Sequence, residues 1–352
     1  MNLEQKVLIC YNEPSRFYDN YLGKNISDSA DNVDLSEREF LKQIALIKKT
    51  LLKTYMSVET LAVNSDIKGA MKKILHFSPD VIFNFVESVE GNSNFESYIA
   101  GMFDILGIPY TGNGPVTLGN CLIKSRTKQI LQSHGIRTPK HWVAYLNETL
   151  DKNEFDLKFP VILKLAREDA SIGISEFSVV RTFNEMIERL DYLHKNFKQE
   201  VLIEEYIEGR ELNVAILGDK ILPISEIRFD GLPDELPKIV TYEAKWSPDS
   251  VYFKHTTPKC PAPLDEQLKQ KIEKMARAAF DAMDCRDYAR VDIRLNQKNV
   301  PYVIEVNPNP DISPDAGFIR SAGTAGISYD EVLYKISTFA LNRMAYDTQA
   351  AS

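Results

Sequence analysis

Residues 288–310 read YARVDIRLNQKNVPYVIEVNPNP, and this stretch decides the fold of the C-terminal part of the chain. Within it, the runs 290–295 and 300–306 are rich in β-branched residues and flank the turn-prone sequence NQKN. This pattern predicts a β-hairpin. Because side chains alternate between the two faces of a strand, we expect Glu305 and Asn307 to point the same way.

Pairing of the two strands can bring Asp292 beside Glu305 and Asn307. Two carboxylates and an amide oxygen form a hard-ligand set that suits Mg²⁺, above all when substrate phosphates complete the coordination shell. Acidic residues on a solvated strand face would show the same pattern. The motif taken alone therefore leaves both interpretations open.

Composition places the chain among ordinary soluble globular proteins. Its 352 residues are too many for one small core and predict two or three domains. The net charge is -8, and no run of lysine and arginine is interleaved with aromatic residues, which argues against a nucleic-acid-binding surface. Any anionic ligand must then be held by local basic groups. The four cysteines have no CxxC spacing, which fits reduced thiols rather than a disulfide framework or a zinc site.

The first residues, MNLEQKVLICY, do not match a signal peptide, because Glu4 precedes a strand-like run. No apolar run approaches the length needed to span a membrane. We therefore expect a cytoplasmic protein that binds neither a membrane nor nucleic acid.

The N-terminal part alternates expected strands with expected helices, which predicts a parallel sheet covered on both faces. Ligands of such sheets bind beyond the carboxyl ends of the strands. The loops that hold Glu13 and Glu87 are therefore candidate substrate contacts, although ordinary surface loops would look the same. A single long helix over residues 116–134 is expected to carry Lys124, and a first domain is expected over 1–135.

A central domain is expected over residues 136–217. Its strand 160–164 ends in Lys164 and is followed by a polar loop that contains Ser171, then by a strand over 174–180. A lysine at a strand end, facing a loop that bears glycine and serine, can hold phosphate oxygens by charge and by backbone N–H groups. The pattern is short and, taken alone, carries little weight.

A C-terminal domain is expected over residues 218–352, with the candidate magnesium site in its hairpin. Residues 230–263 form a long irregular segment with several prolines. Such a segment inside a compact chain is usually a functional lid or a disordered insert. The aromatic residues and the lysine of its sequence YEAKW, at 242–246, favour a lid.

Together these residues resemble the D-alanine:D-alanine ligase branch of the ATP-grasp superfamily. The likeness is carried, in the family's order, by GIPYTGN at 107–113, CLIKSRTK at 121–128, PVILKLARED at 160–169, SIGIS at 171–175, VLIEEYIEGRELNVAILGDKILP at 201–223, YEAKW, YARVDIRL at 288–295 and YVIEVNPNP at 302–310. The resemblance implies an ATP-grasp fold of mixed α/β and α+β class. An N-terminal parallel domain would precede a central mixed domain and a C-terminal antiparallel-sheet domain, with ATP gripped between the last two.

The resemblance also implies roles for individual residues in the nucleotide site. Lys124 and Lys164 match two lysines that contact the nucleotide, with Ser171 in the loop beside them. Glu204 matches the carboxylate that accepts from the adenine amino group, and Glu211 the carboxylate that binds the ribose. The remaining matches are the backbone contacts and the apolar residues around the base, namely Glu205, Ile207, Ile162 and Ile304. The segment 201–207 is interpreted as a strand at the sheet edge whose backbone imitates base pairing.

Roles in the chemistry follow from the same resemblance. Asp292, Glu305 and Asn307 match the ligands of two Mg²⁺ ions. Lys245 matches the lid lysine near the γ-phosphate, and Arg290 matches the arginine near the acyl phosphate.

The chain departs from the family on the amino-acid side. In the family, a glutamate, a serine and a tyrosine tie the lid over the first D-alanine. Here the serine position is Ala170 and the tyrosine position is Trp246. The glutamate has no clear match, which leaves Glu13 as a weak substitute, and the acidic loop that begins at Glu87 lacks the family pattern.

The site for the second substrate departs as well. The glycine that helps form the oxyanion hole corresponds to Asp311, and the Ser-Leu pair that receives a carboxylate corresponds to Ala316 and Gly317. A negative charge at position 311 would oppose a developing oxyanion unless it is turned away or binds a cationic group.

We therefore expect an ATP-dependent ligase that joins a small-molecule carboxylate to an amine through an acyl phosphate, with substrates other than two D-alanines. A true D-alanine:D-alanine ligase of cell-wall synthesis is the alternative. An inactive ATP-binding module is a more distant alternative, because a dead site has no reason to retain its metal ligands and lysines together. The resemblance also suggests a homodimer.

Overall fold

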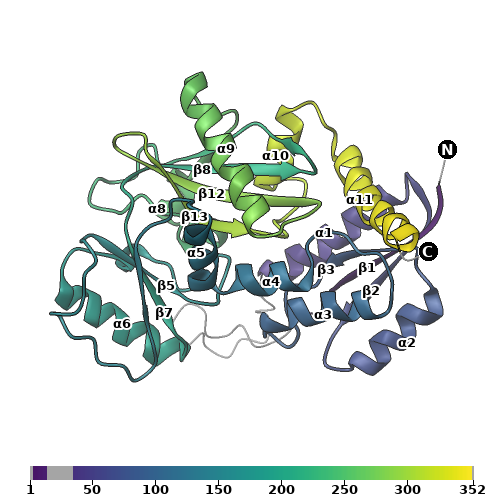
Figure 1. The fold of residues 1–352 in the computed structure, drawn as a ribbon, viewed down its shortest axis with the longest axis horizontal. Coiled ribbons are helices and arrows are strands. Elements are labelled where there is room, and N and C mark those ends of the chain that lie inside the picture. The colour runs from purple at the N-terminus through teal and green to yellow at the C-terminus, as the bar shows by residue number, and fades with distance from the viewer. Residues whose placement is uncertain (1–2, 14–34, 351–352) are drawn as a thin grey trace.

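Three sheets, each built from a different part of the chain, organise the molecule (Figure 1). The computed structural model describes residues 3–13 and 35–350. Within these residues, no helix combines the length and apolarity that a membrane crossing requires.

The first sheet is parallel and has the strand order β2-β1-β3. Its strands are β1 (Leu3–Asn12), β2 (Tyr55–Val63) and β3 (Val81–Phe85). Helix α1 (Leu35–Leu51) packs on one face, and helices α2 (Ile67–Phe77) and α3 (Asn94–Ile105) pack on the other. Residues 7–10 of β1 are all buried because both faces are covered. The predicted parallel sheet is confirmed.

The single long helix predicted after the first sheet is wrong, because the structure has two helices there. They are α4 (Pro115–Leu122) and α5 (Lys124–Ser133), separated by Ile123 in an extended conformation. The break lets the backbone N–H of Lys124 donate to the carbonyl of Ala166 at 3.2 Å. Lys124 thereby becomes the first residue of a helix beside the second sheet.

The second sheet has the order β4-β7-β5-β6. Its strands are β4 (His141–Ala144), β5 (Val161–Leu165), β6 (Val179–Val180) and β7 (Val201–Glu205), and helix α6 (Phe183–Phe197) packs against them. The interpretation of residues 201–207 as an edge strand is wrong, since β7 pairs with β4 on one side and with β5 on the other.

The strand predicted over residues 174–180 forms only at its last two residues. Before them the chain makes the 3-10 turn η2 (Glu176–Ser178). Side chains at its two ends stabilise the turn, because Ser175 and Ser178 form a capping box in which the Ser175 N–H donates to Ser178 Oγ at 3.0 Å.

The third sheet is antiparallel, with the order β11-β10-β8-β12-β13 and the short β9 paired to β8. Its strands are β8 (Gly209–Leu217), β9 (Lys220–Ile221), β10 (Ser225–Arg228), β11 (Thr257–Lys259), β12 (Tyr288–Asn296) and β13 (Pro301–Asn307). Helix α9 (Glu266–Ala282) packs against this sheet. Strands β12 and β13 form the predicted hairpin, with Asp292 opposite Glu305 and Arg290 opposite Asn307.

The boundaries of the three expected domains stay a prediction. Strand β8 lies before the expected boundary at residues 217 and 218, yet it pairs with β10 and β12 of the third sheet. The hydrogen-bonded sheets therefore divide between β7 and β8.

The segment 230–263 contains the short helices α7 (Tyr242–Trp246) and α8 (Val251–His255) as well as β11. It also reaches the central part of the chain, because the N–H of Tyr242 donates to the carbonyl of Ile174 at 3.1 Å.

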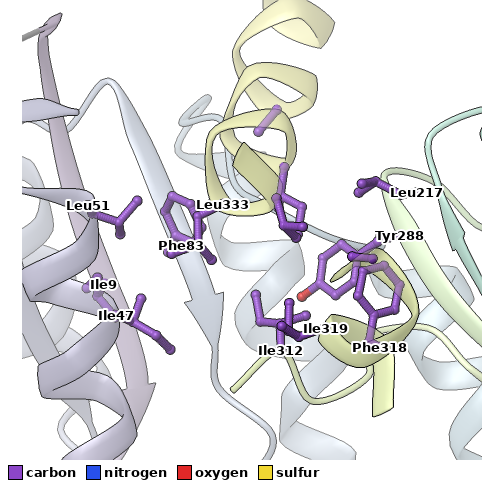
Figure 2. Packing of buried hydrophobic residues seen from close by; sticks show 14 of the residues in the cluster. Ile9, Ile47, Leu51, Phe83, Leu217, Tyr288, Ile312, Phe318, Ile319 and Leu333 are labelled. Atoms are coloured by element: carbon purple, nitrogen blue, oxygen red, sulfur yellow. The ribbon is translucent and has the colours of Figure 1, made fainter. Parts of the chain in front are cut away.

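Two helices follow the third sheet. Helix α10 (Gly317–Thr324) was missed by the sequence analysis, and α11 (Tyr329–Ala350) ends the described chain. Helix α11 packs beside the first sheet, on the face that α1 also covers (Figure 1). Figure 2 shows this shared core, in which Leu333 of α11 lies near Phe83 of β3. The last helix is therefore part of the core built on the first sheet.

Candidate active site

A pocket lies between the second and third sheets. The predicted nucleotide, metal and catalytic residues all line it, namely Lys124, Ile162, Lys164, Ser171, Glu204, Glu205, Ile207, Glu211, Lys245, Arg290, Asp292, Ile304, Glu305 and Asn307. On the substrate side, Gly317 and Ala170 also line it. The other predicted substrate residues, Glu13, Glu87, Trp246, Asp311 and Ala316, do not.

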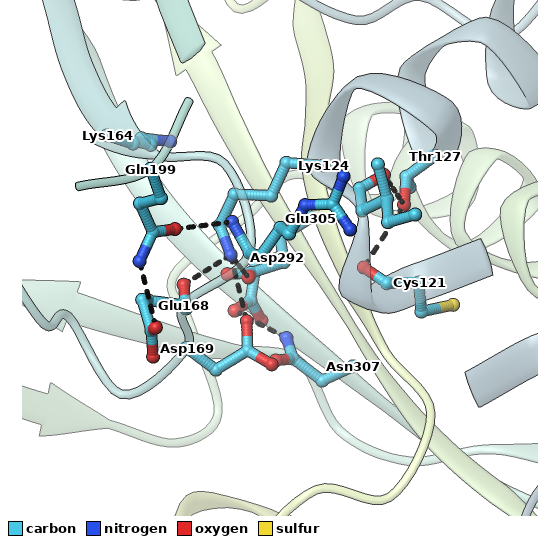
Figure 3. Close-up of polar contacts among 12 residues, drawn as sticks. Cys121, Lys124, Thr127, Lys164, Glu168, Asp169, Gln199, Asp292, Glu305 and Asn307 are labelled. Atoms are coloured by element: carbon cyan, nitrogen blue, oxygen red, sulfur yellow. Dashed lines mark hydrogen bonds and ion pairs between the residues drawn. The ribbon is translucent and has the colours of Figure 1, made fainter. Parts of the chain in front are cut away.

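Lys124 sits at the start of α5 and points its ammonium group toward the pocket (Figure 3). Its Nζ donates to the Glu168 carbonyl at 2.6 Å and to Asp169 Oδ1 at 2.9 Å, and it lies 3.5 Å from Glu305 Oε1. Burial alone would lower the pKa of Lys124, but Asp169 and Glu305 raise it above the ordinary value. Lys124 is therefore a permanent cation that is held by a carboxylate from the neighbouring loop.

Glu204 on β7 is buried between two lysines. Lys128 Nζ lies 2.8 Å from Glu204 Oε2 and also donates to Thr138 Oγ1 at 3.0 Å. Lys164 Nζ lies 2.9 Å from Oε1, although Oε1 accepts no well-formed hydrogen bond from the described residues. Burial would raise the pKa of Glu204, but Lys128 and Lys164 lower it to about 2. Both oxygens of this carboxylate therefore lie beside a lysine, and Oε1 has room for a further donor from a ligand in the pocket.

The two lysines share one negative charge, so the cluster carries a surplus positive charge. Burial lowers the pKa of Lys128, and the charge of Lys164 adds to this effect while Glu204 opposes it. Lys128 was not among the predicted site residues, although it follows Lys124 by four residues on the same helix and so lies on the same face.

Asp292 on β12 accepts hydrogen bonds from three neighbouring side chains. Arg290 forms a two-pronged pair with it, with Nε 2.7 Å from Oδ1 and Nη2 2.8 Å from Oδ2. Asn213 donates to Oδ1 at 2.8 Å, and Asn307 donates to Oδ2 at 3.0 Å. The hairpin therefore brings the predicted metal ligands together, as its pairing pattern predicted.

Glu305 on β13 is surrounded by cations. Burial would raise the pKa of Glu305, but Lys124, Lys164, Arg290 and Lys245 lower it to about 2. In residues 3–13 and 35–350, no group of three His, Cys, Asp or Glu side chains could hold a metal ion without other ligands. An ionised Glu305, Asp292 and the Asn307 amide form a donor set that fits Mg²⁺ if substrate phosphates supply further oxygens.

The loop over residues 169–174 has an unusual backbone. Ala170 has a φ of 53° and Ser171 a φ of 63°, a region that side-chain-bearing residues rarely adopt. Arg189 on α6 holds the loop from below, since its Nη2 donates to the Gly173 carbonyl at 2.7 Å. Strained backbone of this kind gathers at ligand-binding loops.

The pocket is also lined by an ion pair between Glu211 on β8 and Arg294 on β12. Arg294 was not among the predicted site residues. Arg294 Nη1 donates to Glu211 Oε2 at 3.2 Å, and both side chains are largely buried. Arg294 follows Arg290 and Asp292 at two-residue intervals, so the three side chains share one face of the strand. This two-residue spacing could have indicated from the sequence that Arg294 belongs to the site.

The substrate-side residues outside the pocket have other contacts. Glu13 accepts from Asn64 Nδ2 at 2.8 Å, and Asp311 accepts from the N–H and the hydroxyl of Ser313, both at 2.8 Å. Trp246 is 42% exposed. Loss of hydration, followed by the negative charges of Asp311 and Asp169, raises the pKa of Glu87 to about 7.

Ala316 lies just before the first turn of α10 and is its N-cap residue. Gly317, the first residue of that helix, faces the pocket. The N-terminus of α10, which was not predicted, therefore lines the substrate side of the pocket.

Comparisons with known proteins identify the family of this chain. The family model described as D-ala D-ala ligase C-terminus matches residues 131–338. A D-alanine–D-alanine ligase of Carboxydothermus hydrogenoformans is 31% identical over 312 residues, which cover 86% of this chain and 93% of the relative. The protein y4sG of Sinorhizobium fredii is 31% identical over 299 residues, which cover 81% of this chain and 84% of the relative.

A solved structure supports the fold. The D-alanine–D-alanine ligase of Bacillus anthracis complexed with ATP superposes with a TM-score of 0.73 at 24% identity, covering 98% of this chain and all of the other. The mixed architecture of one parallel and two later sheets is therefore the ATP-grasp architecture. With a family model that spans more than half of the chain and relatives that cover most of it, the protein belongs to the D-alanine–D-alanine ligase family and is an ATP-grasp ligase.

Proposed function

We propose that this ligase uses ATP to join a small-molecule carboxylate to an amine, and that its substrates are not two D-alanines. One observation carries the proposed use of ATP. A single pocket gathers four cationic side chains beside two carboxylates and an amide, namely Lys124, Lys164, Lys245, Arg290, Asp292, Glu305 and Asn307.

The cationic side chains would act on the phosphates. The surplus charge at Lys128 and Lys164 favours a phosphate group beside Lys164, and Lys124 can exchange Asp169 for a phosphate oxygen. Lys245 lies on α7 of the segment 230–263 and lines the pocket, where its charge would face the γ-phosphate while the segment excludes water.

Asp292, Glu305 and Asn307 would hold Mg²⁺, with two ions expected from the family resemblance. Such ions neutralise phosphate charge and polarise the transferred phosphoryl group when bound.

In the reaction, a substrate carboxylate oxygen attacks the γ-phosphorus and ADP leaves. The amine then attacks the acyl carbon of the acyl phosphate, phosphate leaves, and the nitrogen loses a proton. Arg290 would donate to the oxyanion of that second step. Its present two-pronged pair with Asp292 keeps the guanidinium fixed in the pocket.

The proposal on substrates rests on the residues that replace the family's amino-acid contacts. Ala170 and Trp246 lack the hydroxyl groups of the serine and tyrosine found there. Asp311 accepts hydrogen bonds from Ser313, and neither Ala316 nor Gly317 carries a polar side chain at the start of α10. An amine substrate larger than alanine, or one without its carboxylate, fits these changes better.

A true D-alanine–D-alanine ligase is the second candidate, because several relatives carry that name, including one from Nitrosospira multiformis that is 33% identical over 250 residues. Those residues cover 71% of this chain and 76% of the relative.

Measuring ADP release with a panel of D- and L-amino acids, amines and dipeptides distinguishes a ligase with other substrates from a true D-alanine–D-alanine ligase. We expect D-alanine as sole substrate to give little turnover and a larger amine to give saturable turnover. Turnover of D-alanine at a kcat/KM of about 10⁴ M⁻¹s⁻¹ or more would favour the second candidate. Failure of every substrate, in a protein that still binds ATP, would instead favour an inactive nucleotide-binding module.

A separate prediction concerns the base of the nucleotide. If Oε1 of Glu204, which lies 2.9 Å from Lys164 Nζ, also accepts from the adenine amino group, ATP should support turnover better than GTP. Removal of a buried acceptor costs about 1 to 3 kcal/mol, so Glu204→Ala should reduce the preference about tenfold. Competition between ATP and GTP in initial-rate assays measures it, and equal use of GTP by the unmutated protein would contradict the assignment.

A further inference from the structure

Arg294 is a buried cation in the pocket that the proposed chemistry leaves without a role. Its side chain lines the pocket, and the residue is 4% exposed. Strand β12 presents Arg290, Asp292 and Arg294 on one face, with Asp292 in the proposed metal site. Arg294 lies farther along, opposite Glu211 in the pairing of β12 with β8.

The guanidinium joins three parts of the chain. Besides the bond from Nη1 to Glu211, Nη2 lies 3.1 Å from the Gly209 carbonyl, 3.0 Å from the Lys238 carbonyl and 3.3 Å from the Tyr206 hydroxyl. The Tyr206 ring also lies below the guanidinium, with its centroid 4.8 Å from Cζ. Because Lys238 belongs to the segment 230–263, Arg294 links this segment to the carboxylate of Glu211.

A purely structural role does not account for this arrangement. A buried ion pair is often no more stabilising than apolar residues of the same shape. The Nε of Arg294 is also buried without a hydrogen-bond partner among the residues that the structure describes, and an unpaired buried donor is unfavourable. A ligand that engages Glu211 and Arg294 together would explain why both charges are kept.

Glu211 needs such a partner if it is to bind hydroxyl groups. Burial raises the pKa of Glu211, and among neighbouring charges Arg294 is the strongest that opposes this. Without Arg294, the carboxylate would be more easily protonated and free to turn, and it would accept hydrogen bonds less well.

We propose that Arg294 is a positioning residue for the ribose of the nucleotide: it fixes the Glu211 carboxylate so that it accepts from the ribose hydroxyls, and it anchors Lys238 of the segment 230–263 at the same point. This inference rests on the proposed use of ATP.

Calorimetric titration with ATP and with 2′-deoxy-ATP tests the proposal without turnover. A hydrogen bond to a charged group implies that the unmutated protein binds ATP about tenfold or more tightly than the deoxynucleotide. Arg294→Met keeps an unbranched, flexible apolar stem but removes the guanidinium, and it should reduce this preference to less than about threefold. In steady-state assays, KM for ATP should rise about tenfold while kcat changes much less.

Arg210→Met is the matched control. Arg210 on β8 forms its own two-pronged pair with the buried Glu226, at 2.8 and 3.0 Å, and it does not line the pocket. This variant should lose stability like Arg294→Met but keep the preference of the unmutated protein for ATP.

An unchanged or larger preference for ATP in a folded Arg294→Met would overturn the inference. If that variant does not fold, Arg294→Lys serves instead, because it retains the charge without the planar fork. It should give an intermediate preference, and full retention would equally overturn the inference. Failure of the unmutated protein to bind ATP would be a different result, since it removes the proposed function and the inference with it.

Discussion

Replacing Glu305 with glutamine should lower kcat by at least about a thousandfold, because the amide keeps the shape of the side chain but loses the charge expected to hold Mg²⁺. The fold should survive, since Glu305 keeps access to solvent and its contact with Lys124 is 3.5 Å long. ADP release by the purified variant, beside its thermal unfolding, measures both effects.

Glu331→Gln is the control for this substitution. Glu331 lies on α11, away from the pocket, where it pairs with Lys335 at 3.5 Å, and its replacement should leave the rate unchanged. If Glu305→Gln retained more than about a tenth of the original rate, the assignment of Glu305 to the metal would be wrong.

The second large effect should follow removal of Lys128. Lys128→Met takes away the closest partner of Glu204, and both side chains are only 1% exposed. Breaking a buried pair from one side typically costs about 3 to 5 kcal/mol because a buried charge is left uncompensated. Lys164 still lies near the other oxygen, so we expect the lower end of this range in urea unfolding.

The double variant Lys128→Met/Glu204→Gln provides the control, because it removes both charges. It should be less destabilised than the sum of the single variants. A loss below about 1 kcal/mol in Lys128→Met would show that the pair contributes little.

The pair also predicts an acid dependence of stability. In the folded protein the pKa of Glu204 is about 2, below the ordinary glutamate value of 4.5. Its contribution is therefore complete above about pH 4.5 and is lost as the pH falls toward 2. The free energy of unfolding should therefore change less with pH between about 4.5 and 2 in Lys128→Met than in the unmutated protein.

Local pattern was enough to predict the hairpin of β12 and β13, because pairing partners are close in sequence and the face of each side chain follows from its position. The structure places Asp292 opposite Glu305, which the pattern allowed, and a shift in the pairing register between Asp292 and Ile293 produces this placement. The placement of Lys164 and Ser171 in one pocket could also be predicted, because a strand and the loop that follows it are close in space.

Features set by distant contacts were not predictable in the same way. No glycine or proline marks the break at Ile123, which instead accompanies a hydrogen bond from Lys124 to Ala166 in another part of the chain. The central place of β7 depends on where β4 and β5 pair. The roles of Lys128 and Arg294 emerge only once their partners are placed, because a buried lysine or arginine looks like a surface residue in the sequence.

The packing of α11 against the first sheet has a consequence for synthesis on the ribosome. The strands of that sheet are complete by Phe85, but the core residues Leu333 and Ile336 are synthesised only about 250 residues later. At a typical rate of about 5 to 20 residues per second, the delay is roughly 10 to 50 s. During this interval the nascent sheet keeps part of one apolar face uncovered, which makes this face the expected binding site for a ribosome-associated chaperone.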